Sequence, residues 1–535
     1  MFNALWREGL NAGRRLSADG RRAILKLNDQ SELLAHVDHR RALDRLRTAP
    51  PYVLRKAGEG RLEELRTPAQ AVERLAALWG EPGLNWPLLK AELEQSATNL
   101  DRFLAAVPAR AAELIAQGHE HALAAGEVAL EGWNLRGHEL HPGCKTRFGF
   151  SSEELERYSP ELGCRLDLRF VALRRDHAVD TAIAPADLPP AWRQVLESEL
   201  ESPEDYHLLA VHPWQYQHKL PELFADEFRR GVLRALKTRF PATPLASLRT
   251  VVPLDQPGAH HLKLPLAVQS TSALRTVSPQ SAQNGPRLSA LLRQIPGVTL
   301  QAEERGIHFW QEGEDLDRAR HLSLLFRQAP EPVPGTWLVP VAVLSERNPL
   351  DGRALVAEAV ELFGGDPVAF AIAYTELTAR TFLPALFEYG VAIEAHGQNC
   401  LVRLRQGQPV ELVLRDLGGI RILFDWLHRR GLDVSLHPAS VVIARTPEEL
   451  VAKSHHTYLQ GHLAPVFSAL AETYKVHERL LWRAASRAFR EHWCYGPEAE
   501  RLWFAPRIEV KALTRMRLGG RSHQYDFCQV ENPLA

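Results

Sequence analysis

The spacing of apolar residues predicts long amphipathic helices near both ends of the chain. Apolar positions recur every three or four residues in segments 69–79, 86–107, 109–125, 353–389 and 447–493. Gly and Pro residues separate these segments. We therefore predict a helical region from the N-terminus to about Leu130 and long helices in the last third of the chain.

Shorter apolar runs predict strands in the middle of the chain. Residues 165–175 and 207–212 read as strands, and the second run stops at a proline. A Pro-rich stretch at 327–340 is the best candidate for a domain boundary. The pattern as a whole predicts a multidomain α+β protein, with units at 1–130, 131–335 and 336–535.

A β-hairpin is predicted in the last of these units. Residues 400–405 and 410–415 are rich in β-branched and apolar side chains, and the sequence QGQP between them supplies the turn. A turn centred in the middle of QGQP places Asn399 opposite Asp416 at the open end.

The open end of this hairpin gathers oxygen ligands. Glu394 and His396 arrive beside Asn399 and Asp416. Carboxylate and amide oxygens suit Mg²⁺ shared with phosphates better than they suit zinc. A surface hairpin with incidental polar ends is the alternative interpretation.

Composition limits the class of protein. The 535 residues are too many for one core, so two or three domains are expected. Lys and Arg number 64 and Asp and Glu 65, which gives no support for a nucleic-acid or anionic-membrane partner. The sequence has no signal-peptide core and no apolar run long enough to span a membrane. The five cysteines are scattered and lack zinc-site spacing, so we expect reduced thiols and a cytoplasmic location.

The segment from 247 to 275 has the chemistry of a polyphosphate site. The residues with this chemistry are three cations and three of the hydroxyls in the segment, namely Ser247, Arg249, Thr250, Lys263, Thr271 and Arg275. Exposed charges on a sheet are the alternative. Lys263 argues against that alternative because its neighbours are apolar, and a buried lysine costs several kcal/mol unless an anion meets it.

A second group of cations lies in the loop 137–150, where His138, His141, Lys145 and Arg147 alternate with Gly and Pro. Such a loop brings imidazole, ammonium and guanidinium groups toward one anion. An ordinary charged surface loop is the alternative that composition leaves open. Common phosphate and hydrolase motifs are absent, namely GxxxxGK[ST], GxGxxG, HExxH and GxSxG.

The motifs resemble a known family when they are taken in order. They are GHxxHPxxKxRxGF at 137–150, HPWQ at 212–215, SxRT at 247–250, KLPL at 263–266, TSxxR at 271–275, EAHxQN at 394–399 and RDxxG at 415–419. This series resembles the siderophore synthetases that work without peptide-synthetase modules, of the aerobactin-synthetase type. The resemblance covers about residues 130 to 520. Glu139-Leu140 departs from it, because many members have proline next to the first histidine.

The resemblance implies a fold and a reaction. It implies a cupped hand with a helical thumb (1–130), mixed-sheet fingers (131–335) and a palm (336–535), commonly as a homodimer. ATP and Mg²⁺ would adenylate a carboxylate of citrate or a citrate derivative. An amine or hydroxylamine-bearing amine would then capture the acyl group, with release of AMP and pyrophosphate.

The resemblance also implies roles for single residues. The nucleotide would be held by Ser247, Arg249, Thr250, Lys263, Thr271, Arg275, His396, Asn399 and Asp416. The metal would be held by Glu394, Asn399 and Asp416. The carboxylic substrate would meet His141, Lys145 and Lys511, and catalysis would depend on Arg275, His396, His141 and Lys263.

Two other functions remain open at this level. A kinase-like phosphotransferase would use Asn399 and Asp416 to hold a metal and would form ADP. A non-catalytic protein that binds anionic ligands or siderophores would need the cations but no turnover. The presence of both the cationic block and the metal block argues against the non-catalytic protein.

Overall fold

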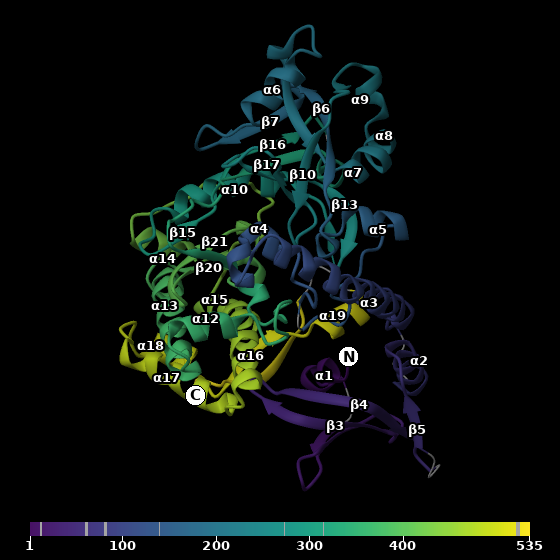
Figure 1. Ribbon diagram of the computed structural model, residues 1–535, viewed down its shortest axis with the longest axis vertical. Helices are drawn as coiled ribbons and strands as arrows, with labels where there is room; N and C mark the ends of the chain where they lie inside the picture. Colours follow the sequence, from purple (N-terminus) through teal and green to yellow (C-terminus); the bar gives the residue numbers. More distant parts are fainter. Residues whose placement is uncertain are drawn as a thin grey trace.

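The computed structural model describes residues 1–10, 13–58, 62–79, 83–138, 140–271, 273–313, 315–520 and 525–535. Within these residues, buried apolar side chains gather in three large clusters, which lie mostly in the thumb, the fingers and the palm as defined by the residue ranges above. Figure 1 shows the fingers at one end of the molecule and the palm beside the thumb at the other. The multidomain α+β fold is confirmed. Glu139 and Ser272, which belong to the quoted motifs, lie outside the described residues.

The N-terminal part begins with a sheet, so the prediction of a helical region is wrong for residues 13–65. An antiparallel sheet runs in chain order through β1 (Gly13–Leu16), β2 (Arg22–Lys26), β3 (Glu32–Arg41), β4 (Arg45–Arg55) and β5 (Leu62–Leu65). In β3, buried Leu33, Ala35 and Val37 alternate with less buried residues. This period of two is typical of a half-buried strand. The helical spacing begins only after the sheet, at residue 69, and the prediction wrongly extended it back to the N-terminus.

Helices cover the rest of the thumb. α1 (Phe2–Glu8) precedes the sheet, and α2 (Pro68–Trp79) and α3 (Trp86–Ala116) follow it. The predicted helices at 69–79 and 86–107 are confirmed, and α3 continues through Pro108. Asn85 caps α3 by accepting a hydrogen bond from the backbone N–H of Leu88 at 3.1 Å.

The fingers are built on an antiparallel sheet in the spatial order β7-β16-β17-β12-β11-β10-β6-β8, with β9 paired to β6. The strands are β6 (Leu166–Arg174), β7 (Ala178–Ala182), β8 (Tyr206–Val211), β9 (Leu233–Ala235), β10 (Phe240–Pro244), β11 (Thr250–Pro253), β12 (His261–Lys263), β16 (Glu303–Phe309) and β17 (Ser323–Arg327). The predicted strands at 165–175 and 207–212 are therefore confirmed as β6 and β8. A separate hairpin pairs β13 (Leu266–Ser270) with β14 (Ala273–Arg275).

Short helices surround this sheet, and one longer helix lies between it and the palm. The helices are α5 (Ser152–Tyr158), α6 (Pro190–Glu197), α7 (Pro213–His218), α8 (Leu220–Leu223), α9 (Ala225–Arg229), α10 (Pro279–Leu292) and α11 (Leu316–Ala319), whereas α4 (Glu127–Glu131) contacts the palm strand β18 (Trp337–Pro340). α10 packs against β16 and β17 on one side and approaches the palm on the other (Figure 1).

The palm combines a small sheet with long helices. Its sheet has the order β15-β21-β20-β18, from β15 (Thr299–Leu300), β18 (Trp337–Pro340), β20 (Cys400–Arg405) and β21 (Gln408–Leu414). Two-residue strands β19 (Val391–Ala392) and β22 (Arg421–Ile422) pair nearby. The helices are α12 (Val356–Phe363), α13 (Pro367–Phe387), α14 (Phe424–Arg429), α15 (Pro447–Ser454), a π-helix (His455–Leu463), α16 (Ala464–Tyr474), α17 (Glu478–Glu491) and α18 (Pro497–Trp503).

The end of the chain returns from the palm to the thumb. β23 (Arg507–Lys511) pairs with β24 (Phe527–Glu531), and α19 (Leu513–Leu518) lies between them in sequence. Glu8 of α1 accepts hydrogen bonds from the first N–H groups of α19, those of Thr514 and Arg515. This carboxylate caps the helix and ties the two ends of the chain together.

The predicted hairpin exists, but its register differs by one residue. The turn is Gln406-Gly407, with both residues at positive φ, and a bulge follows between Arg403 and Leu404. As a result Cys400 pairs with Leu414, and Arg415 N donates to Asn399 O at 3.0 Å. Asn399 therefore faces Arg415, not Asp416. A two-residue turn with both residues at positive φ matches the twist of the paired strands, so the chain turns at Gln406-Gly407 and not in the middle of QGQP. Together with the bulge, this shifts the register by one residue.

Candidate active site

Asp416 stands where the palm hairpin meets the fingers. Its Oδ1 is ion-paired with Lys263 Nζ on β12, and its Oδ2 lies 3.0 Å from Arg327 Nη2 on β17. Lys263 Nζ also donates to Glu303 Oε1 at 2.8 Å. Burial alone would raise the pKa of Asp416, but Lys263 and Arg327 hold it well below its usual range. The carboxylate is therefore ionised and joins the fingers to the palm.

Arg249 and Arg275 add positive charge that the described carboxylates do not match with an ion pair. Arg249 Nη1 donates to the carbonyl of Thr276. Arg275 Nη2 donates to Thr271 Oγ1 at 3.2 Å, while its buried Nε has no hydrogen-bond partner in the described part of the chain. Burial and the charges of Arg249 and Arg147 lower the pKa of Arg275 to about 9. Cations so poorly matched indicate that an anion belongs here.

The SxRT motif is a turn that carries Arg249 to this place. Thr250 N donates to Ser247 Oγ at 3.2 Å, which closes the turn. Thr250 then opens β11 and pairs with Lys263 of β12. Its Oγ1 is buried and lacks a hydrogen-bond partner among the described residues. The predicted phosphate-binding residues are thus brought together by neighbouring strands.

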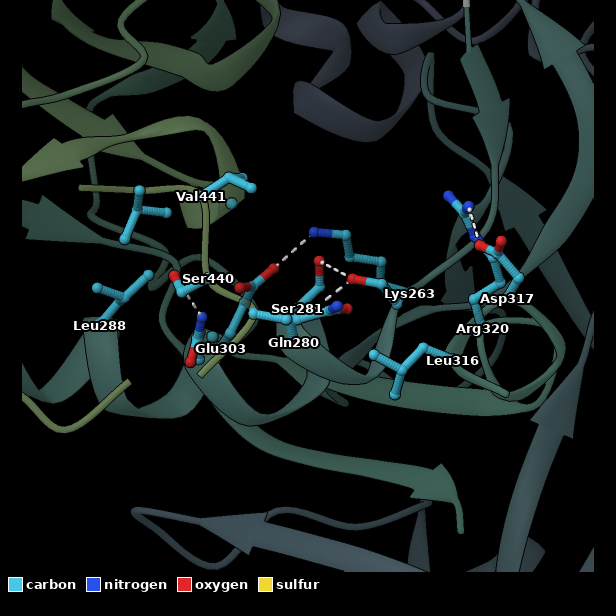
Figure 2. Close-up of a pocket in the computed structure, with 16 residues that line it drawn as sticks. Lys263, Gln280, Ser281, Leu288, Glu303, Leu316, Asp317, Arg320, Ser440 and Val441 are labelled. Carbon is cyan, nitrogen blue, oxygen red and sulfur yellow. Dashed lines mark hydrogen bonds and ion pairs between the residues drawn. The ribbon is translucent and has the colours of Figure 1, made fainter. Parts of the chain in front are cut away.

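A cavity of about 300 Å³ opens beside Lys263 and Glu303. Its floor is the first part of α10, and its roof comes from Gly418 and from residues 439–442 of the palm. Figure 2 shows Val441 and Leu288 on one side, Asp317 and Arg320 on the other, and Lys263 between them. The cavity is therefore lined by polar, charged and apolar side chains together.

The roof of this cavity is tied to α10 by one side chain. Asn284 Nδ2 donates to Ser440 Oγ at 3.1 Å, and Asn284 Oδ1 accepts from the backbone N–H of His437 at 2.8 Å. Asn284 is buried. Its two hydrogen bonds hold the palm loop over the fingers.

Glu394 lies on the palm side of the same region. Lys453 Nζ donates to Glu394 Oε1 at 2.5 Å. Burial would raise the pKa of Glu394, but Lys453 and His396 lower it below its usual range. Gly419 of the RDxxG motif is needed here, because a Cβ at this position would lie 1.8 Å from Glu394 Oε2. Only glycine lets the backbone approach the carboxylate so closely.

Asn399 and Asp416 are not joined by a hydrogen bond in the described residues. Asn399 Nδ2 donates to the carbonyl of Glu394 at 3.3 Å, whereas Asp416 turns to the fingers. The neighbouring Arg415 makes the contacts at this end of the hairpin. Its guanidinium donates to the carbonyl of Gln398 at 2.8 Å and to buried Glu131. Asp416 itself has a φ of 63°, a left-handed conformation that costs energy and is found at functional sites.

The predicted histidines stand close to Arg275. Burial lowers the pKa of His396, and burial with His138 and Arg517 lowers the pKa of His141 to about 3. Gly143 N donates to His141 Nδ1 at 3.1 Å, so the neutral ring carries its proton on Nε2. His141 is therefore a hydrogen-bond donor at Nε2.

Lys511 and Lys145 have different surroundings in the structure, although the family resemblance implies that both contact the carboxylic substrate. Lys511 Nζ lies 3.8 Å from the ring centroid of Tyr525, and burial and Lys453 lower the pKa of Lys511 to about 8. Lys145 is buried and donates to Glu161 Oε1 at 2.7 Å and to the carbonyl of Asn134 at 2.5 Å. The structure thus brings Lys511, but not the ammonium of Lys145, toward the Glu394 group.

Sequence reasoning missed several residues of this site. Arg327 ends the apolar strand SLLFR, which is the same signal that identified Lys263. Lys453 and Asn284 lie on ordinary amphipathic helices, where nothing in the pattern distinguishes them. The loop 439–442 carries no charged residue and gave no signal.

The oxygen donors predicted for Mg²⁺ are Glu394, Asn399 and Asp416, and both carboxylates are ion-paired with lysines. Glu394 and Asp416 are both held ionised, and the amide of Asn399 lies beside Glu394. This donor set fits Mg²⁺. Among the described residues, no group of three or more His, Cys, Asp and Glu side chains is arranged to hold a metal ion.

The chain shows its relationships when it is compared with known proteins. It is 31% identical to staphyloferrin A synthase from Staphylococcus aureus over 421 residues, which are 74% of this chain and 71% of that protein. The IucA / IucC family model matches residues 127–346. The chain belongs to the IucA / IucC family. It is accordingly a siderophore synthetase, and the resemblance seen in the motifs is confirmed.

Other members of the IucA / IucC family match over similar lengths. D-Ornithine–citrate ligase from Staphylococcus aureus is 26% identical over 456 residues, which are 75% of this chain and 69% of that protein. A second model, described as a ferric iron reductase FhuF-like transporter, matches residues 368–526 in the palm. No helix in the described ranges is long and apolar enough to cross a membrane.

Solved structures share the fold of the chain over its full length. The petrobactin biosynthesis protein AsbB from Bacillus anthracis superposes with a TM-score of 0.82 at 19% identity, covering 100% of this chain and 93% of that one. ATP-bound aerobactin synthetase IucA from Klebsiella pneumoniae gives a TM-score of 0.79 at 19% identity, covering 100% and 98%. These likenesses establish the fold.

Proposed function

We propose that this family member is an ATP-dependent ligase that adenylates a carboxylate of citrate or a citrate derivative and transfers the acyl group to an amine. One observation carries the proposal. Arg249 and Arg275 lie beside the Lys263–Asp416 ion pair, and no carboxylate in the described residues forms an ion pair with either guanidinium. A polyphosphate next to the cavity at α10 would supply the missing negative charge.

The substrates would divide the site between them. The nucleoside would lie in the cavity of about 300 Å³ under residues 439–442. The triphosphate would meet Arg249, Lys263 and Arg275, with hydroxyls from Ser247, Thr250 and Thr271. The carboxylic substrate would approach from the side of His141 and Lys511. The names of related proteins, such as D-ornithine–citrate ligase, support a citrate-type acid as this substrate.

The first step joins two anions. A carboxylate oxygen attacks the α-phosphorus, the bond to the β-phosphate breaks, and pyrophosphate leaves. Arg275 and His396 would stabilise the charge that develops on the α-phosphate oxygens. The Nε2 proton of His141 would orient the attacking carboxylate.

The second step forms the amide. The nitrogen of a neutral amine attacks the acyl carbon, AMP leaves with the bonding electrons, and the nitrogen loses a proton. No side-chain nucleophile is needed for either step. Mg²⁺, held by Glu394, Asn399 and Asp416 with phosphate oxygens, would neutralise phosphate charge.

Product analysis tests this proposal. The protein is incubated with ATP, Mg²⁺, citrate and hydroxylamine, and hydroxamate, AMP and pyrophosphate are measured. We expect all three in equal amounts. ADP and orthophosphate in their place would indicate a phosphotransferase, and calorimetric binding without turnover would indicate a binding protein; family membership favours neither.

Substrate identity, assembly and location are part of the same proposal. A pyrophosphate-release screen of citrate, a citrate monoamide and 2-oxoglutarate against diamines would identify the acid and the amine. Light scattering after gel filtration would test the expected homodimer. All five cysteines are free thiols, which supports a reducing compartment such as the cytoplasm.

A further inference from the structure

A π-helix lies directly behind the segment that carries Glu394 and His396. It runs for nine residues, His455–Leu463, between α15 and α16. π-Helical turns are rare and occur often at functional sites. Nearly all of its side chains are buried, so it contacts the core and the active-site segment and not solvent.

Two side chains of the π-helix contact backbone carbonyls of that segment, those of Ile393 and Ala395. Thr457 Oγ1 lies 2.9 Å from the carbonyl oxygen of Lys453 and 3.3 Å from that of Ile393, so the two carbonyls share its proton. His462 Nδ1 lies 2.9 Å from the carbonyl of Ala395. Glu394, between these two residues, is held by Lys453 at the end of α15. The carbonyls of Ile393 and Ala395 thus contact the π-helix, while the carbonyl of Glu394 accepts from Asn399 Nδ2.

Close packing completes this arrangement at His396. A Cβ added to Gly461 would lie 3.1 Å from His396 Cβ, which is tighter than ordinary contact. Gly461 therefore lets the π-helix backbone approach the histidine. The backbone of Gly461 thus packs directly against His396.

The hydrogen bonds of His462 determine its tautomer. A carbonyl only accepts, so the ring must carry its proton on Nδ1 to bond Ala395. Burial lowers the pKa of His462 to about 4, which keeps the ring neutral. Its Nε2 lone pair is then free to accept from the hydroxyl of Tyr374, 2.7 Å away on α13. Tyr374 is fully buried and its raised pKa keeps the hydroxyl protonated.

We propose that His462, locked by Tyr374 as the tautomer protonated on Nδ1, is a positioning residue that orients the peptide between Ala395 and His396. This inference rests on the proposed adenylation, in which His396 meets the nucleotide phosphates. It extends the active site to α13, a core helix that touches neither substrate. The order of contact is Tyr374 to His462 to Ala395, and then along the chain to His396.

Two replacements of His462 separate positioning from packing. Asparagine places its amide N–H near the position of Nδ1 and keeps the donor to Ala395. Glutamine places its amide near Nε2 and loses that donor. We expect His462→Gln to lower kcat for pyrophosphate release by roughly tenfold or more, because small misplacements at a reacting centre have large effects. His462→Asn should recover most of this loss, while KM for ATP and for the acid changes little in either variant.

Two buried tyrosines provide a matched pair. Tyr374→Phe removes the hydroxyl that donates to His462. Tyr458→Phe removes a hydroxyl of equal burial that bonds Thr378 at 2.6 Å and has no hydrogen bond to His462 in the described residues. Both should lower the melting temperature by a similar amount. Only Tyr374→Phe should also lower kcat, by a fewfold.

Hydrogen exchange gives a readout that does not need turnover. The amide of Asn399 donates to the carbonyl of His396 at 2.9 Å, so its protection reports the shape of the segment. Exchange of the peptide 393–399 should rise in His462→Gln and stay near wild type in His462→Asn. If the wild-type protein forms no AMP, the proposed chemistry fails, and the exchange result still decides the inference. Equal exchange and equal kcat in the Asn and Gln variants, or equal kcat loss in the two tyrosine variants, would overturn it.

Discussion

Two clusters of cations in this protein differ in whether a carboxylate of the chain forms an ion pair with them. In the first, Lys145 and Arg147 share the carboxylate of Glu161, at 2.7 and 3.0 Å. Other donors of the two residues contact backbone carbonyls and a serine hydroxyl, while the buried Nε of Arg147 has no hydrogen-bond partner in the described part of the chain. In the second, Arg249 and Arg275 lie near the ion pair of Lys263 with Asp416. The cations of the first cluster are ion-paired with a carboxylate, and among the described residues Arg249 and Arg275 of the second are not.

The difference is one of charge balance and access. Glu161 is 1% exposed, and its pKa is lowered by Lys145 and Arg147 against the effect of burial. At the second cluster the carboxylate of Asp416 is already ion-paired with Lys263 and Arg327. The residue types are the same in both places. A buried cation indicates a ligand only where no carboxylate of the chain has already matched it.

The largest effect is expected from breaking the balanced cluster. Glu161→Gln leaves two buried cations without their carboxylate, and we expect the free energy of unfolding to fall by about 3–5 kcal/mol. Urea denaturation measures this change. Glu388→Gln, at a more exposed pair with Arg430, is the control and should cost less than about 1 kcal/mol. Similar losses in the two variants would contradict the comparison.

Removing a cation from the unbalanced cluster should have the opposite signature. Arg275→Met should lower pyrophosphate release by about 10²- to 10³-fold, as loss of a transition-state donor does. Its melting temperature should stay the same or rise, because a buried cation near Arg249 and Arg147 is removed. Single-turnover assays and thermal melting test the two halves. A large loss of stability would place Arg275 with Lys145 as a structural residue.

The pH dependence of kcat/KM for the carboxylic substrate tests the role of Lys511. Its pKa is lowered to about 8, so the charged form that attracts a carboxylate is present below pH 8 and is lost above it. We expect kcat/KM for the carboxylic substrate to fall up to tenfold per pH unit above this value. In Lys511→Met this limb should disappear. A limb unchanged in the variant would assign it to another group.

The smallest effect is expected at the edge of the cavity. Asn284→Ala removes the two hydrogen bonds that hold residues 437–440 over α10. The loss of about 1 kcal/mol of binding corresponds to an increase of about fivefold in KM for ATP. KM for the carboxylic substrate should not change. Initial rates at varied ATP and varied acid distinguish the two, and a shared change would remove the cavity from the nucleotide site.

Much of the site follows from local pattern. Lys263 is recognisable because a lone cation in the apolar run HLKLPL must meet an anion. Helical spacing identifies α13 and the start of α3, and turn residues identify the palm hairpin. The order of the motifs identifies the family. All of these depend on residues that are near one another in the chain.

Other features depend on contacts that no local pattern encodes. The bulge next to Arg403 changes the register of the hairpin. The N-terminal sheet depends on hydrogen bonding between its strands. The hairpin at 400–415 therefore illustrates both kinds of information, since the sequence predicts its strands and the tertiary structure sets which residues meet at its end.

By itself, then, the sequence determined the fold class, the family and which residue types carry the chemistry. Only the tertiary structure decided which cations are matched. Lys145 meets Glu161 within the same part of the chain, whereas Lys263 and Asp416 are 153 positions apart. The physical reason is that ion pairs form between groups that are close in space, while sequence patterns report groups that are close along the chain.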